Sequence, residues 1–122
     1  MAKAAYDGNS NLLFLATALN TIVATAKLTL TGAKSHQILL IGQFSIDGSS
    51  LVNGIVVGTI MVDGNPFLDV QVNNLNGNVG TIVVVSGIVT LPRHPHTFDL
   101  VAYTNATGLT VHHRALSVVD LG

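Results

Sequence analysis

The chain has 122 residues, the length of one domain, and it contains no cysteine. Only 9 % of its residues are charged, against roughly 25 % in an average globular domain. The few basic residues are scattered and the net charge is −1, which excludes the positive patch of a nucleic-acid-binding protein. With so few charges, much apolar surface must be exposed or covered by a partner.

The first segment, residues 1–17, is predicted to be a peripheral N-terminal arm or first strand, with strand pattern over 12–17. The apolar run 12–30 overlaps the end of this segment and is long enough to be considered as a membrane-spanning helix. It contains Asn20, Lys27 and several threonines, which are poor residues for a transmembrane helix. The residues before it also lack a charged leader, so we expect neither membrane insertion nor a classical signal peptide.

Residues 21–31 alternate with the period of a β-strand. Ile22, Ala24, Leu28 and Leu30 share one face, whereas threonines and Lys27 occupy the other. This pattern predicts a strand that buries one side and exposes the other to water.

Three later segments, 37–46, 55–62 and 81–91, are apolar at nearly every position. A strand with both faces apolar has to be covered on both faces, whereas a half-exposed antiparallel strand alternates more cleanly. No helical pattern is present to provide the second cover. The pattern therefore predicts that another copy of the chain covers it.

Turn residues such as Asp63-Gly64 separate the strands at short intervals, because Asp-Gly and Asn-Gly accept the positive φ of tight turns. About eight strands are predicted, the remaining ones over 68–72, 97–103 and 109–121. Many short strands with regular turns indicate an all-β antiparallel jelly-roll sandwich of eight to ten strands, formed by a single domain, 1–122. Its predicted core is Ile22, Leu28, Leu30, Ile38, Leu40, Phe44, Val56, Ile60, Val83, Val85, Phe98, Leu100, Leu116 and Val118.

The second half of the chain also resembles a known family. The segment from Val89 to Pro92, the run His96-Thr97-Phe98 with Leu100, the turn at Gly108, and the closing pattern Leu116, Val118, Asp120, Leu121 are similar to the end of the trimeric jelly-roll heads of the tumour-necrosis-factor and complement-type superfamily. The nearest resemblance is to the C-terminal domains of bacterial collagen-like spore-surface proteins. The chain differs in having His94-Pro95 where the family has a Gly before the His, and in having no collagen-like segment.

This resemblance implies a compact homotrimer. It places the strands 37–46 and 97–103 side by side on an inner sheet around the threefold axis. The interface residues it implies are Leu39, Ile41, Val101 and Tyr103.

The histidines are the main candidates for site chemistry. His94 and His96 are two apart, a spacing that allows two imidazoles in a strand to bind one metal ion, but Pro95 between them favours a turn. We therefore expect no metal and no cofactor, with His94 and His96 as the weak alternative. His112 and His113 are adjacent and should point to opposite sides of a strand.

No motif of a nucleophilic enzyme is present, and we expect no catalysis. Two classes of function remain: a structural or assembly protein of a cell, spore or virion surface, and a lectin-like or receptor-binding module. Glycan or protein contacts in the second class are assigned to the Asn-rich loop with Asn73, Asn74, Asn76 and Asn78.

Overall fold

The computed structural model describes residues 3–32, 34–48, 54–75 and 81–122, which fold as a two-sheet antiparallel β-sandwich of nine strands. The strands are β1 (Ala4–Asn9), β2 (Leu13–Phe14), β3 (Thr21–Thr29), β4 (His36–Gly48), β5 (Gly54–Val62), β6 (Asn65–Leu75), β7 (Thr81–Leu91), β8 (Pro95–Thr104) and β9 (Leu109–Asp120). In these residues, no helix is long and apolar enough to cross a membrane. The expectation of an all-β antiparallel sandwich is confirmed.

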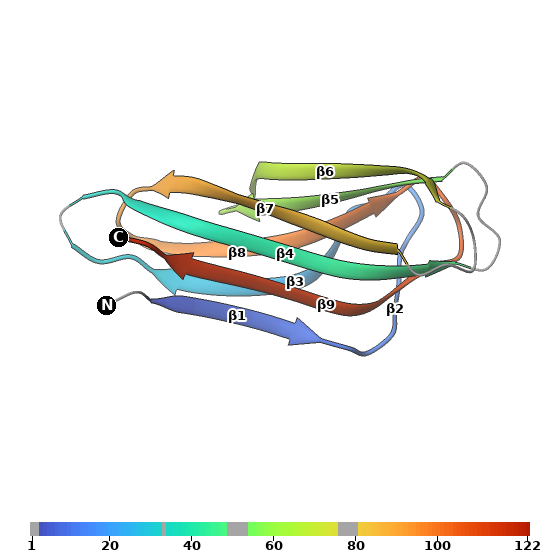
Figure 1. Cartoon of the computed structure of the whole chain (residues 1–122), viewed down its shortest axis with the longest axis horizontal. Helices are drawn as coiled ribbons and strands as arrows, with labels where there is room; N and C mark the ends of the chain where they lie inside the picture. The colour runs from blue at the N-terminus through green and yellow to red at the C-terminus, as the bar shows by residue number, and fades with distance from the viewer. Residues whose placement is uncertain (1–2, 33, 49–53, 76–80) are drawn as a thin grey trace.

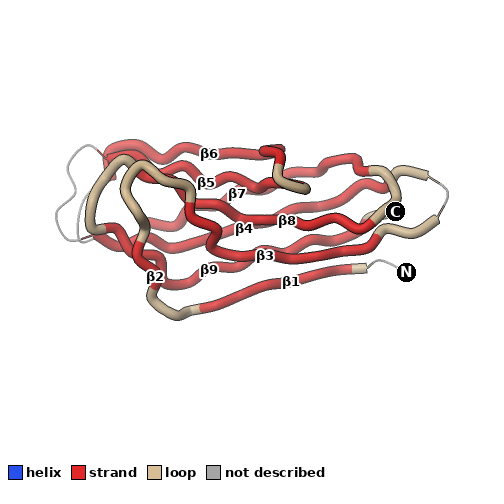
Figure 2. The backbone as a smooth tube through the Cα atoms, turned by 180° about the vertical axis from the view of Figure 1, so that it is seen from behind, coloured by secondary structure: helices blue, strands red, loops and turns tan. Residues whose placement is uncertain are grey.

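The two sheets lie face to face, as Figure 1 shows from one side and Figure 2 from behind. The first sheet has the order β1-β9-β4-β7, and the two-residue strand β2 pairs with β9 beside it. The second sheet has the order β3-β8-β5-β6. Both ends of the chain lie at the same end of the sandwich (Figure 1).

The core lies between the sheets and consists of the inward positions of each strand, as strand alternation requires. All predicted core side chains are buried except Ile22, which is 58 % exposed. The cause is a register shift in the β3–β8 pairing between Ile22 and Ala24, which marks a β-bulge. The bulge places Val23 and Ala24 both in buried positions and leaves Ile22 outside.

The predicted adjacency of the strands around Ile41 and Val101 is wrong. Ile41 lies in β4 of the first sheet, and Val101 lies in β8 of the second sheet. The neighbours of β4 are β9, predicted as the closing strand 109–121, and β7, predicted as the strand 81–91. Both strands have the same apolar pattern as β8. Period-two alternation shows which face a residue occupies but not which sheet its strand joins.

Close contact between the sheets depends on glycine at position 58 of β5. A Cβ atom there would lie 2.9 Å from Cγ2 of Val85, 3.0 Å from Cγ1 of Val83 and 3.1 Å from Cε1 of Phe44. These three side chains are among the most buried in the molecule. Gly58 therefore allows two opposed strands to approach more closely than any other residue would permit.

Candidate functional site

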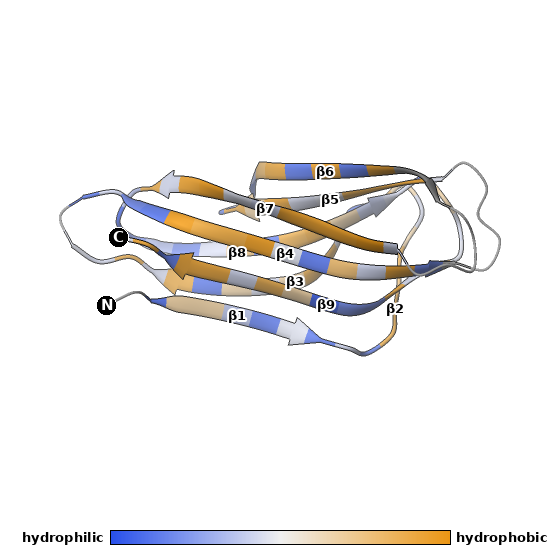
Figure 3. Ribbon diagram, in the orientation of Figure 1, coloured by the Kyte–Doolittle hydropathy of each residue, from blue (hydrophilic) through white to orange (hydrophobic). Residues whose placement is uncertain are grey.

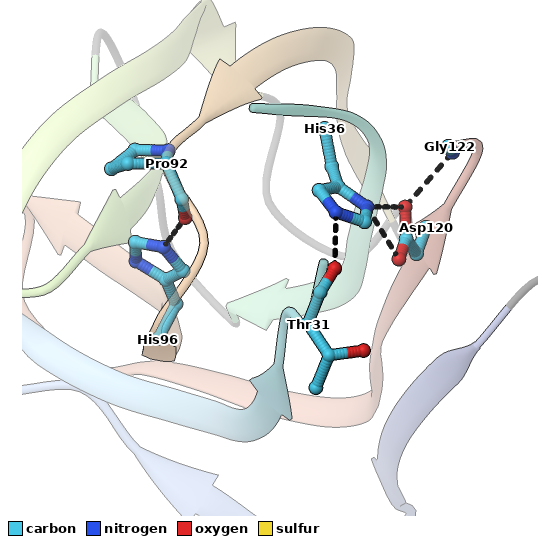
Figure 4. A network of polar contacts seen from close by, with 6 residues as sticks. All are labelled: Thr31, His36, Pro92, His96, Asp120 and Gly122. Carbon is cyan, nitrogen blue, oxygen red and sulfur yellow. Dashed lines mark hydrogen bonds and ion pairs between the residues drawn. The ribbon is translucent and has the colours of Figure 1, made fainter. Parts of the chain in front are cut away.

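Two histidine–aspartate pairs lie at the end of the sandwich where β3 passes to β4 and β7 passes to β8. Figure 4 shows His36 beside Asp120, and His96 beside the backbone of Pro92. The first pair joins the start of β4 to the end of β9, and the second joins the start of β8 to Asp63 in the turn between β5 and β6.

His36 bridges a carboxylate and a backbone carbonyl. Its Nδ1 lies 2.9 Å and 3.0 Å from the two carboxylate oxygens of Asp120, and its Nε2 lies 2.7 Å from the carbonyl oxygen of Thr31. Since both ring nitrogens face acceptors, both donate when the ring is protonated. The side chain thereby ties the β3–β4 connection to the last strand.

Asp120 is a buried carboxylate held by several partners. Burial alone would raise the pKa of the Asp120 carboxyl, but the backbone N–H of Gly122 donates to it at 2.9 Å and His36 lies beside it. These interactions stabilise the ionised form, and Lys3 adds a weaker attraction, so the pKa of Asp120 lies below its ordinary value.

Asp63 is the first of the two central residues of a tight β5–β6 turn. Asp63 and Gly64 have φ of 51° and 83°, the positive values that a two-residue hairpin turn of type I′ requires at both central residues. Its Oδ1 accepts the N–H of Thr97 at 2.9 Å, and its Oδ2 lies 2.6 Å from Nδ1 of His96. The turn was predicted from sequence, but its contact with His96 was not.

The pKa of the Asp63 carboxyl is also below its ordinary value. Partial desolvation would raise this pKa, but the Thr97 N–H, the hydrogen bond to His96 and the nearby imidazoles of His96 and His94 outweigh it. The environment of Asp63 thus favours a negative charge next to two imidazoles.

His96 is buried and His94 is exposed. Nε2 of His96 lies 2.8 Å from the carbonyl oxygen of Pro92, and Nδ1 of His94 lies 3.1 Å from that of Pro95. The two rings lie with centroids 4.1 Å apart. One ligand atom from each of Asp63, His94 and His96 lies within 4.8 Å of the others. Sequence reasoning paired the histidines but missed Asp63, because it is 31 residues before His94.

His112 and His113 differ in burial, as expected for adjacent residues whose side chains point to opposite sides of a strand. His112 is half-buried and its Nε2 lies 2.9 Å from a carboxylate oxygen of Asp47, whereas His113 is exposed.

The outer face of the first sheet is apolar. Three rows of paired residues cross it and contain no charged side chain: Ala4, Val119, Leu39 and Ile88; Tyr6, Ser117, Ile41 and Ser86; Gly8, Ala115, Gln43 and Val84. We call these twelve residues, together with Ile82, the apolar face. Ile41, Ile82, Val84 and Ile88 are exposed on it, and Figure 3 shows the hydrophobic stretches of β4, β7 and β9 side by side.

The outer face of the second sheet is polar by comparison. It carries Thr25, Lys27 and Asp99, and the hydroxyl of Thr25 donates to Asp99 at 2.7 Å. Val101 lies in this sheet but is only 3 % exposed, and Tyr103 is half-buried there. The four predicted interface residues therefore fall on two different faces: Leu39 and Ile41 on the outer face of the first sheet, and Val101 and Tyr103 on that of the second.

A shallow hollow of about 350 Å³ opens at one side of the apolar face. Its lining residues are Tyr6, Gly8, Asn9, Ser10, Gln43, His113, Arg114 and Ala115. The side chains of the predicted ligand residues are not among those that the structure describes. Asn76 and Asn78 are outside the described residues, and Asn73 and Asn74 are described only as backbone of β6.

No family model and no curated protein matches the chain. Among solved structures, dimeric latent PorU from Porphyromonas gingivalis aligns with 98 % of the chain at 10 % identity and a TM-score of 0.53, and the chain covers 13 % of PorU. A β-glucosidase from Paenibacillus barengoltzii aligns with 75 % of the chain, which covers 10 % of that enzyme, at 16 % identity and a TM-score of 0.41. The C-terminal CBM6 of LamC from Zobellia galactanivorans aligns over 95 % of the chain and 98 % of its own length, at 13 % identity and a TM-score of 0.37. The similarity to PorU shows the β-sandwich fold alone, and the other two structures superpose too loosely to bear on function.

Proposed function

We propose that this chain is a non-enzymatic structural module that assembles with copies of itself, as a homotrimer, into a surface, appendage or virion component. The observation that carries the proposal is the apolar face. Four large aliphatic side chains there, Ile41, Ile82, Val84 and Ile88, are between 39 % and 68 % exposed. A face of this kind on a folded domain is typical of an interaction surface.

The partner that fits best is a second copy of the chain. The rows of the apolar face contain no charge that would require an oppositely charged partner. Covering it completely would contribute roughly 1 kcal/mol or more per large side chain, since full burial of such a side chain is worth about 1.5–3 kcal/mol and each is already partly buried. Large apolar interfaces of this kind are typical of obligate homo-oligomers.

The strand order supports the jelly-roll part of the resemblance. When β2 is left aside, the first sheet contains the first, eighth, third and sixth strands, and the second sheet the second, seventh, fourth and fifth. This is the order of a jelly roll of two Greek keys. The resemblance to trimeric jelly-roll heads implies that one sheet faces the threefold axis, and we assign that role to the sheet of β4 because its outer face is apolar.

The histidine centres support a structural role over catalysis. A general base needs a ring nitrogen that can take a proton from a substrate. In both His36 and His96, each nitrogen already faces a carboxylate or a backbone carbonyl of the protein. These rings therefore serve as cross-links between loops and strands.

The test is the mass of the protein in solution, measured by light scattering with wild type, Ile41→Asp and Phe67→Asp. We expect three chains for wild type and for Phe67→Asp, and loss of the trimer for Ile41→Asp, because an unpaired carboxylate would be buried. Phe67 is the matched control: it is 46 % exposed on the outer face of the second sheet, against 39 % for Ile41. A wild-type mass of one chain in dilute solution would overturn the proposal.

A binding module is the second candidate, and the hollow beside Tyr6 favours it. An exposed aromatic ring with Gln43, His113 and Arg114 around it combines an apolar surface with hydrogen-bond donors, as sugar sites do. A glycan array separates the candidates. Binding to a defined sugar that is lost in Tyr6→Ala would favour the module, and an array without signal together with a trimeric mass would favour assembly.

A further inference from the structure

We propose that Asp63, His94 and His96 form a binding site for a divalent transition-metal ion such as Zn²⁺, with two imidazole nitrogens and one carboxylate oxygen as ligands. This site is independent of the proposed assembly, because all three residues belong to one chain. The ligand types are those that Zn²⁺ prefers, and three protein ligands leave a fourth position open to water or another molecule.

Each of the three side chains is oriented by a backbone group that does not itself belong to the site. Nε2 of His96 is directed at the carbonyl of Pro92, and Nδ1 of His94 at the carbonyl of Pro95. Oδ1 of Asp63 accepts the N–H of Thr97. Metal-binding histidines commonly donate their second ring N–H to a carbonyl in this way, which fixes the tautomer and turns the other nitrogen toward the ion.

The three residues are close enough to converge on one ion. One ligand atom from each lies within 4.8 Å of the others, and Nδ1 of His96 is 2.6 Å from Oδ2 of Asp63. Two ligands of a tetrahedral ion at about 2.0–2.1 Å are separated by roughly 3.3 Å. The Asp63–His96 contact therefore has to open by a fraction of an ångström, while the exposed ring of His94 moves inward.

The ion would replace a proton rather than fill a gap in the core. When the ring of His96 is protonated, Nδ1 donates to Oδ2 of Asp63 and Nε2 donates to the carbonyl of Pro92. On metal binding the Nδ1 proton leaves to solvent, Nε2 keeps its own, and the metal takes the place of the lost proton between Nδ1 and Oδ2. His96 is therefore satisfied in both states, and the fold does not depend on the ion. Treatment with EDTA should leave the protein folded.

The experiment titrates Zn²⁺ alone into EDTA-treated, buffer-exchanged protein by isothermal calorimetry, with Co²⁺ absorbance as a second readout of tetrahedral coordination. We expect one ion per chain. His94→Ala should weaken binding by at least about tenfold, because removing even an indirect support of a metal ligand typically costs 10–100-fold. His94 is exposed, so this variant should fold normally, and an unchanged circular dichroism spectrum would verify that.

The matched control is His112→Ala, which removes the histidine of the Asp47 pair at the other end of β9. It should bind Zn²⁺ as wild type does, whereas Asp63→Asn should bind as weakly as His94→Ala. The proposal is overturned if wild type takes up no Zn²⁺, if binding survives His94→Ala, or if His112→Ala abolishes it. One ion per three chains would also overturn it, because the site would then lie between subunits.

Discussion

Replacing Gly58 by alanine should destabilise the sandwich by overfilling its core. The added Cβ would lie 2.9–3.1 Å from carbon atoms of Val85, Val83 and Phe44, whereas packed carbon atoms sit about 3.5–4.0 Å apart. All three neighbours are at most 2 % exposed, and close-packed interiors leave few voids into which such side chains could move. Overpacking of this kind costs about 1–3 kcal/mol, and the smaller entropy of the unfolded alanine chain returns about 0.4–1 kcal/mol. A net loss of about 1–2 kcal/mol in the free energy of unfolding is therefore expected.

The measurement is urea unfolding followed by circular dichroism, at one protein concentration for all variants because the proposed assembly would make the midpoint concentration-dependent. Gly87→Ala is the control: its Cβ would meet the end of the Leu68 side chain at 3.0 Å, and Leu68 is only half-buried. It should cost less than about 0.5 kcal/mol. Adding Val85→Ala to Gly58→Ala should restore space, so the double variant should be more stable than the sum of the single effects by about 1 kcal/mol. A Gly58→Ala protein as stable as wild type, or strictly additive effects, would refute the close approach of the sheets.

Three further outcomes are expected. Ile22→Ser should change stability by less than about 0.5 kcal/mol and Val23→Ser should cost about 1–3 kcal/mol, as judged by urea midpoints; the reverse order would contradict the bulge. Gly64→Ala should cost roughly 1 kcal/mol although nothing lies within 4 Å of its added Cβ, because its φ of 83° is unfavourable for alanine; an unchanged thermal midpoint would contradict this. Asp120 contributes stability above its ordinary pKa of about 3.9 and loses it as the pH falls through the lowered value in the folded protein. Asp120→Asn should thus be less stable than wild type at neutral pH and nearly equal to it in strong acid, and a gap that widens on acidification would count against the His36–Asp120 pair.

Much of the fold can be predicted from the sequence because strand burial repeats every second residue. The inward residues of β4, β5, β7, β8 and β9 follow from alternation alone, and the Asp63-Gly64 turn follows from the need for positive φ. Residues 1–17 are predicted as a peripheral arm or first strand with strand pattern only over 12–17, because the segment that forms β1 contains no β-branched residue. The pairing of β1 with β9, not its composition, makes it a strand.

The parts that could not be predicted depend on which strands become neighbours. The bulge at Val23 reverses the alternation of β3 without any glycine or proline to signal it. The carboxylate of Asp63 reaches His96 only because β5 and β8 pair in the second sheet, so no sequence spacing connects the two. The separation of Ile41 from Val101 has the same origin, because alternation does not distinguish one sheet from the other.

The shared location of the chain ends has a mechanical consequence. β1 and β9 are antiparallel neighbours, and the N–H of Asp120 donates to the carbonyl of Lys3 at 2.7 Å beside the start of one strand and the end of the other. A force that pulls these two ends apart would act on this last hydrogen bond first and then on each following one, from Ala4–Val119 toward Asn9–Arg114. Such a ladder opens one rung at a time, so the domain should yield at low force when pulled by its ends, however stable its core is.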